Sequence, residues 1–248
     1  MNSSTSYKVL DNFACLLVGE PKSGHSSLAM AFPDPWFLDL DRNLSSVIRR
    51  SGTKRFFYDQ LQSTNPVQHF DEIEALTKAA IAHPEVKTIV YDSVSALSRI
   101  LTENILARLQ LAGAKFRDDT IDKQLRIQDY QTLLTFVLRL VALCRASGKY
   151  VIWTAHQKAD KDEGTGVLRY EVQIPGGLKS NLGSYFTDVW AVTSQSQPGG
   201  GCKYSIRTKP TGYHINLGSS FPIDPEVDVT NKSPSDVWPI LAPKLGVK

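Results

Sequence analysis

The segment GEPKSGHS, residues 19–26, has the residue types and spacing of a loop that binds phosphate. It follows an apolar run and precedes a stretch suited to a helix, so that successive backbone N–H groups and a helix N-terminus point at one spot. The pattern is G-x-x-x-x-G-K-[ST] except that His25 stands in place of the lysine. The alternative is an ordinary strand-to-helix turn. The residues expected to bind a nucleotide are Gly19, Glu20, Pro21, Lys22, Ser23, Gly24, His25, Ser26 and Ser27.

Two oxygen-bearing side chains are candidates for a Mg²⁺ site. Ser26 ends the loop, where a hydroxyl would ligate the ion. Asp92 ends the apolar run TIVYD, where the carboxylate that holds Mg²⁺ in ATPases is found. An Asp at that point can instead cap the next helix, and Ser93 would cap equally well. We expect Ser26 and Asp92 to share one metal.

Three further polar residues end predicted strands and are candidates for catalysis. Asp39 and Asp41 close the run WFLDLD, and Asp41 is the better candidate to orient the attacking water. Both could simply cap a helix that begins after Asn43. His156 follows the run YVIWTA and is expected in the crevice beyond the strand ends, where it would sense the γ-phosphate. The alternative for His156 is a purely structural role.

Strands and helices that alternate along the chain must position these residues. Strands are expected at 13–18, 36–39, 54–58, 88–92 and 150–155, and helices at 67–82, 94–111 and 126–146. This alternation predicts βαβ units, that is, an α/β fold with a mainly parallel central sheet flanked by helices.

The composition changes after residue 156. Residues 158–166 are charged and glycine-bearing and are expected to form a loop. Strands at 186–193 and 202–208, joined by a Gly-rich turn, predict a C-terminal hairpin at the edge of the sheet. Residues 1–218 are thus expected to form one nucleotide-binding domain. Residues 219–248 form a Pro-rich tail with a short helix at 234–241, packing on the core or on a neighbouring molecule.

Length and composition restrict the class of protein. The 248 residues are 42% hydrophobic and 21% charged, as in ordinary globular proteins. Three widely spaced cysteines argue against a disulfide framework and favour a reducing, cytoplasmic setting. No apolar stretch approaches the roughly 20 residues that span a bilayer, so no membrane association is expected. The net charge of +3 permits a nucleic-acid partner without requiring one.

Two stretches mix basic and aromatic side chains as proteins that bind single-stranded nucleic acid do. Both also contain acidic residues, so solvated loops are the alternative reading. The first candidate set for DNA contact is Lys158, Lys161, Arg169, Tyr170 and Lys179. The second, in residues 114–126, is Lys115, Phe116, Arg117, Lys123 and Arg126.

In order and spacing, GEPKSGHSSLA, WFLDLD, TIVYDSVSAL, LRIQDYQ and YVIWTAHQ resemble the phage-encoded RecA-like P-loop ATPases of the AAA_24 type. The resemblance covers roughly residues 13–208, and the group includes core-only recombinases that act as single-strand annealing proteins. It implies a RecA-like fold that binds ATP and Mg²⁺ and forms a ring or filament on single-stranded DNA in phage DNA recombination or strand annealing. The location would then be the host cytoplasm, and a single-stranded DNA-binding protein is a further partner that the resemblance allows.

The sequence departs from this family pattern in two places. His25 replaces the lysine that bridges the β- and γ-phosphates, and imidazole, with an ordinary pKa near ~6.5, is mostly neutral at neutral pH. We therefore expect at most a weak DNA-dependent ATPase, because a fixed positive charge is missing. Relatives also carry a Lys-x-Arg-like element that acts on the neighbour's nucleotide. Residues 213–220 lack it, and only Arg207 and Lys209, slightly upstream, could replace it.

Two other functions fit parts of the pattern. One is a nucleotide-free RecA-like scaffold or oligomerisation module, in which the altered loop no longer binds ATP. The other is a P-loop kinase or another NTPase that acts on a small substrate. A kinase would need an arginine-rich lid near the phosphates, and no Arg-dense segment follows the central helices.

Overall fold

The computed structural model describes most of the chain. The described residues are 13–52, 54–113, 125–126, 128–161, 166, 168–175, 178–214 and 216–247. Among them, no helix is both long and apolar enough to cross a membrane.

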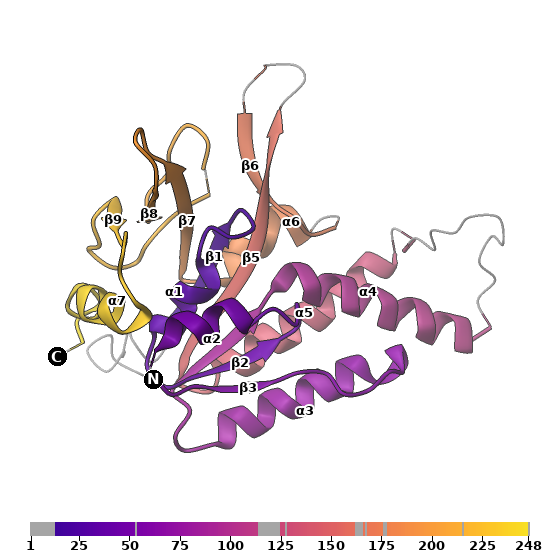
Figure 1. Cartoon of the computed structure of the whole chain (residues 1–248). Helices are drawn as coiled ribbons and strands as arrows, with labels where there is room; N and C mark the ends of the chain where they lie inside the picture. Colours follow the sequence, from indigo (N-terminus) through magenta and orange to yellow (C-terminus); the bar gives the residue numbers. More distant parts are fainter. Residues whose placement is uncertain are drawn as a thin grey trace, which may run out of the picture.

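A single twisted sheet runs through the molecule (Figure 1). Its strand order is β3-β2-β4-β5-β1-β7-β8-β9, with β6 paired to β5 outside this path. The pairs from β3 to β7 are parallel, and β5–β6, β7–β8 and β8–β9 are antiparallel. The expected α/β fold with a mainly parallel sheet is confirmed. The strands are β1 (Ala14–Gly19), β2 (Pro35–Asp39), β3 (Phe57–Asp59), β4 (Thr88–Asp92), β5 (Tyr150–Lys161), β6 (Leu168–Val172), β7 (Asp188–Ser196), β8 (Cys202–Arg207) and β9 (Glu226–Asp228).

Two hydrophobic cores lie on opposite faces of this sheet, because successive side chains of a strand point to opposite sides. In β1, Leu16 and Val18 belong to the core beneath α3, α4 and α5, while Cys15 and Leu17 belong to the core beneath α1, α2 and α7. This two-sided burial explains the nearly continuous apolar runs of the central strands. The helices are α1 (His25–Ala31), α2 (Ser45–Ser51), α3 (His69–Ala82), α4 (Val94–Leu111), α5 (Asp129–Arg145), α6 (Leu178–Asn181) and α7 (Pro234–Leu241), with 3-10 turns η3 (Pro66–Gln68), η4 (Leu182–Tyr185) and η5 (Ala242–Leu245).

The C-terminal segment packs on the face that carries α1. The Trp238 ring lies 5.2 Å from the Phe32 ring, centroid to centroid, and Val237 and Leu241 are buried. A capping box between Ser233 and Asp236 starts α7, which spans the residues expected for the short helix.

One expectation is corrected: the β7–β8 hairpin is not at the edge of the sheet, because β9 pairs outside β8.

Two expected segments have different secondary structure. Of the predicted charged loop, residues 158–161 instead belong to β5, which continues past the sheet and pairs with β6 above the rest of the molecule (Figure 1). Residues 162–165 of that loop lie outside the described residues. Alternation of polar and apolar residues is weak there, which hid the strands. The expected strand at 54–58 shrinks to Phe57–Asp59. Lys54 instead donates to the carbonyls of Ala31 and Phe32 at the C-terminal end of α1.

Candidate functional site

The glycine-bearing loop connects β1 to α1 through a tight turn. The N–H of Ser23 donates to the carbonyl of Glu20 at 3.0 Å, which folds the loop back over the end of β1. A Cβ on Gly19 would lie 2.2 Å from Oγ of Ser23 and 2.9 Å from the backbone carbonyl oxygen of Val192, so only glycine fits there. Gly24 has φ 101°, a left-handed conformation that glycine adopts without strain. Glycine is therefore needed at position 19 because there is no room for a side chain, and at position 24 because the backbone is left-handed.

Ser26 and Asp92, the expected metal ligands, meet at the end of this loop. The hydroxyl of Ser26 donates to Oδ1 of Asp92 at 3.1 Å. Thr154, on the neighbouring strand β5, donates to the same oxygen at 2.5 Å. No described residue donates a hydrogen bond to the other oxygen, Oδ2. A hydroxyl and a carboxylate are therefore held together beside the loop, with one carboxylate oxygen unused.

Burial dominates the electrostatics of Asp92. It raises the pKa of the carboxyl to about 6, although the hydrogen bonds from Thr154 and Ser26 favour the ionised form. The nearby carboxylates Asp41 and Asp39 raise this pKa further. A cation next to Asp92 would lower this pKa again, because an opposite charge favours the ionised carboxylate.

The two aspartates at the end of β2 have different surroundings. Asp39, only 2% exposed, accepts from the N–H of Asn43 at 3.0 Å and from the side chain of Gln60 at 2.7 Å. Asp41 instead lies beyond the strand, because its N–H and that of Leu40 both donate to the carbonyl of Asp92. Asp39 thus holds the segment after β2 in place through its hydrogen bonds with Asn43 and Gln60, whereas Asp41 faces the phosphate loop.

Two histidines and Asp41 meet beside the phosphate loop. His156 is aligned with Gly19 in the β1–β5 pairing. Its Nε2 lies 3.4 Å from Oδ2 of Asp41, and its ring meets the His25 ring edge to face at 5.1 Å between centroids. His25 is 5% exposed, and its Nδ1 lies 3.3 Å from Oγ of Ser23. Nδ1 of His156 is buried and has no hydrogen-bond partner among the described residues.

These contacts shift the pKa values of the two histidines in opposite directions. Burial, and then the charge of His156, lower the pKa of His25 to about 4, against a smaller opposing effect of Asp41. The hydrogen bond to Asp41 raises the pKa of His156 in spite of burial. Burial alone would raise the pKa of Asp41, but hydrogen bonds with His156 and Ser93 lower it overall. At neutral pH, His25 is therefore uncharged, whereas protonation of His156 is favoured by the negative carboxylate of Asp41 beside it.

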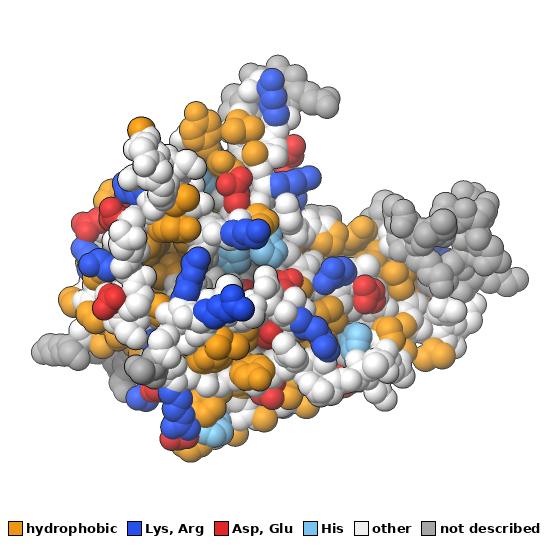
Figure 2. Space-filling model, in the orientation of Figure 1, with side chains coloured by type: hydrophobic (Ala, Val, Ile, Leu, Met, Phe, Trp, Pro, Cys, Tyr) orange, Lys and Arg blue, Asp and Glu red, His pale blue; other side chains and the backbone are white. Residues whose placement is uncertain are grey.

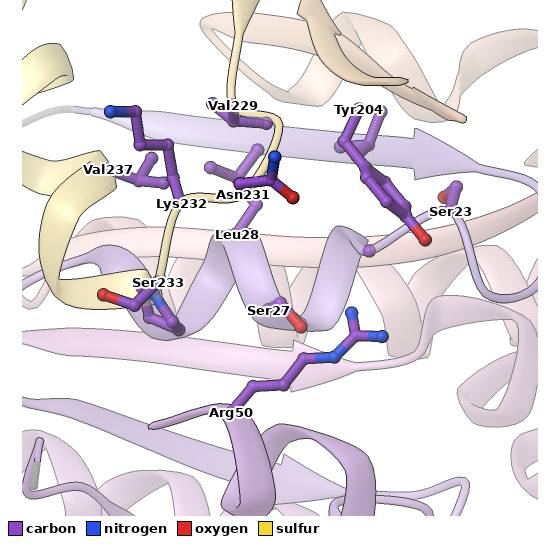
Figure 3. A pocket seen from close by; sticks show the side chains of 13 residues that line it. Ser23, Ser27, Leu28, Arg50, Tyr204, Val229, Asn231, Lys232, Ser233 and Val237 are labelled. Carbon is purple, nitrogen blue, oxygen red and sulfur yellow. The ribbon is translucent and has the colours of Figure 1, made fainter. Parts of the chain in front are cut away.

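A pocket of about 370 Å³ opens on the α1 side of the loop (Figure 3). Tyr204 of β8 and Arg50 of α2 point across its mouth from opposite sides of α1, near Ser23 and Ser27. Its other end combines apolar side chains with polar ones: Leu28, Val229 and Val237 lie there together with Asn231, Lys232 and Ser233. The pocket has the size and mixed lining of small-molecule sites.

The first candidate set for DNA contact is spread along the hairpin and beyond it. Lys158 and Lys161 are exposed on β5, and Arg169 is exposed on β6. Tyr170 stacks on the His214 ring, with centroids 4.5 Å apart and planes 6° from parallel. Lys179 lies on α6 and forms an ion pair with Glu171.

The structure describes only some of the other basic residues that the sequence singled out. In the second candidate set only Arg126 lies among the described residues; Lys115, Phe116, Arg117 and Lys123 lie outside them. Arg207 ends β8 and lies 3.8 Å from Glu226, and Lys209 is exposed just after it. Figure 2 shows Lys and Arg side chains gathered around histidines at the centre of one face.

Sequence reasoning missed several residues of the site. Thr154 could have been found, because a threonine inside a run of buried apolar residues needs a hydrogen-bond partner. Arg50, Tyr204 and His214 carry no local signal, since they reach the site from α2, β8 and a loop far along the chain.

Comparisons with known proteins give the family and the fold of this chain. A search of curated proteins finds no match. Among solved structures, the RadB recombinase has 12% sequence identity and a TM-score of 0.51, over 94% of this chain and 97% of that chain. A KaiC-like protein of the hyperthermophilic archaeon Pyrococcus horikoshii has 14% identity and a TM-score of 0.47, over 88% of this chain and 89% of that chain. A family model described as an AAA domain, AAA_24, matches residues 11–215. The chain therefore belongs to the AAA_24 family and has the fold of RecA-like P-loop ATPases.

Proposed function

We propose that this protein binds ATP with Mg²⁺ at the 19–27 loop, assembles on single-stranded DNA and serves phage-type recombination or strand annealing, with little or no ATP hydrolysis. The observation that carries the proposal is the Ser26–Asp92 pair at the end of the glycine loop. Family membership makes nucleotide binding the expected use of such a pair.

The residues at the loop fit a magnesium nucleotide. Mg²⁺ in ATPases is held by one or two protein oxygens together with phosphate oxygens and water. Ser26 and Asp92 supply a hydroxyl and a carboxylate of this kind. The described residues contain no group of three or more His, Cys, Asp or Glu that could hold a metal ion. When bound, Mg²⁺ would neutralise phosphate charge next to Asp92.

The adjoining pocket fits the rest of a nucleotide. The aromatic ring of Tyr204 and the apolar groups of Leu28 and Val229 offer contacts for a base. The guanidinium of Arg50 lies at the mouth, beside the loop, where it would meet phosphate or ribose oxygens.

The same geometry supports binding more strongly than hydrolysis. His25 is too short and too weakly basic to supply the positive charge that a lysine gives to the transferring phosphate. A γ-phosphate-sensing role for His156 is supported by its contacts with His25 of the loop and with Asp41, whose pKa is lowered by its hydrogen bond with His156. We propose that ATP acts here mainly as a ligand for conformation and assembly.

DNA binding is proposed for the β5–β6 hairpin. Lys158, Lys161 and Arg169 give it exposed positive charge at the same end of the sheet as the phosphate loop. Phosphate backbones are attracted by such charge irrespective of sequence. Asp160 and Glu171 lie on the same hairpin, so the net attraction is moderate.

Two measurements on the purified protein test the proposal. Mg²⁺-ATP should raise the unfolding temperature as RT ln(1 + [ATP]/Kd) predicts, whereas a nucleotide-free scaffold would show no shift. Fluorescence anisotropy at low salt should detect binding to a single-stranded oligonucleotide. Absence of binding, with and without ATP, would exclude the recombination and annealing role.

A further inference from the structure

A second pocket, of about 730 Å³, lies beside the hairpin on the other face of the sheet. Its floor is formed by Leu16 and Val18 of β1, side chains of the α3–α5 core, whereas the first pocket lies on the α1 side. The two pockets are therefore separated by the sheet. No part of the phosphate loop lines the second one.

The aromatic wall of this pocket is already in place. Tyr170 and His214 stack face to face, and the N–H of Tyr170 donates to the carbonyl of Tyr213 at 3.0 Å. This bond ties the hairpin to the loop that carries His214. Burial and the charge of Arg207 lower the pKa of His214, so its ring is neutral at neutral pH. Neutral stacked rings present a surface on which a nucleobase packs.

Polar groups in the pocket have unused hydrogen-bonding capacity. Gln157 is 3% exposed, and its amide has no hydrogen-bond partner among the described residues. The amide of Asn216, across the pocket, also has none among them. Each amide can donate and accept, as the edge of a base requires.

The charges at the rim suit one phosphate. Lys179 is neutralised by its ion pair with Glu171. Arg169 also lines the pocket and forms no ion pair with another described residue. A guanidinium of this kind binds phosphate oxygens through paired N–H donors.

We infer that this second pocket binds one nucleotide unit, with its base against Tyr170 and the apolar floor, its base edge on the amides of Gln157 and Asn216, and its phosphate on Arg169. The inference rests on the proposed function in taking single-stranded DNA as the source of the unit; a free mononucleotide has the same chemistry. His156 and Gln157 are consecutive on β5 and point to opposite faces, so the residue that contacts His25 of the phosphate loop is followed directly by one that lines the second pocket.

The test uses oligothymidylate carrying a single 2-aminopurine, whose fluorescence changes when the base stacks. Tyr170→Ala should weaken binding about 10-fold and abolish the fluorescence change, and Tyr170→Phe should keep both. Ser184→Trp should fill the pocket from its exposed rim and weaken binding similarly without removing a charge. Tyr213→Ala is the matched control, because Tyr213 is 54% exposed and does not line the pocket.

The outcomes separate this inference from the proposed function. If the wild type binds the oligonucleotide but Tyr170→Ala and Ser184→Trp bind equally well, the pocket inference is wrong and the DNA role stands. Competition by thymidine monophosphate would support the pocket and identify a free nucleotide as sufficient. If neither the oligonucleotide nor the monophosphate binds, the inference is overturned, whereas the thermal shift with Mg²⁺-ATP, unchanged in Ser184→Trp, still tests the first pocket independently.

Discussion

The phosphate loop and the β5–β6 hairpin extend from the same end of the sheet, on the paired strands β1 and β5. Their ionisable side chains differ in exposure: those around the loop are mostly buried, and the lysines of the hairpin are exposed. Around the loop, the titratable groups are largely buried and hydrogen-bonded to neighbouring side chains: Asp92 to Ser26 and Thr154, and Asp41 to His156. On the hairpin, Lys158 and Lys161 project into solvent. A buried, pre-bonded site selects one ligand geometry, whereas exposed charge attracts a polyanion from any direction and depends on salt.

The largest change in affinity is expected from the variant that removes the buried carboxylate charge of Asp92. Asp92→Asn keeps an oxygen for Ser26 and Thr154 but cannot ionise. We expect Mg²⁺-ATP affinity to fall by about 100-fold or more, since the metal loses its carboxylate. Isothermal calorimetry measures this directly. Oligonucleotide binding by the hairpin should change less than twofold, and a parallel loss there would mean that the two regions are not independent.

The same variant should be more stable than the wild type without nucleotide. Burial raises the pKa of Asp92 to about 6 from 3.8, so ionising it destabilises the fold at every pH above 6. This penalty is absent below 3.8. Chemical denaturation at pH 8 should therefore show Asp92→Asn more stable by about 3 kcal/mol, and equal stability would contradict the assigned burial.

A pH series tests the buried histidine. The folded pKa of His25, about 4, lies below its ordinary value of 6.5, so the unfolded chain binds a proton that the folded chain does not. Stability should fall as pH drops through 6.5 and stop falling below 4. Between pH 7 and pH 5 the wild type should lose about 2 kcal/mol relative to His25→Gln in denaturant titrations. Parallel curves for the two proteins would show that His25 is not the group involved.

Restoring a fixed positive charge should convert binding into hydrolysis. His25→Lys is expected to raise the ATPase rate about tenfold or more, because a lysine stabilises charge on the transferring phosphate. Phosphate release is the assay, with His25→Gln as the uncharged control. An unchanged rate would mean that the site lacks more than this one charge.

The smallest effect is expected on the hairpin. The double variant Lys158→Ala, Lys161→Ala should weaken oligonucleotide binding several-fold and reduce the slope of log K against log salt by about 1.4. Its thermal response to Mg²⁺-ATP should match the wild type. Lys203→Ala, which removes a lysine paired with Glu226 on β8, serves as the control and should leave the salt slope unchanged.

By itself, the sequence determined the loop, the fold class and the ends of the strands that meet at the site. These depend on short-range rules: Gly19 and Gly24 satisfy backbone geometry, and five-residue apolar runs such as TIVYD are buried on both faces. Asp92 and His156 could be predicted for the same reason, since each directly follows such a run or closes it.

Only the tertiary structure decided which of these groups touch. The His25–His156 contact and the Asp41–His156 pair exist because the strands lie in the order β2-β4-β5-β1, an order that the chain sequence does not state. The second pocket joins residues from 16 to 217. Contacts between residues so far apart follow from strand order and packing rather than local propensity, which is why the loop was predictable and the pocket beside the hairpin was not.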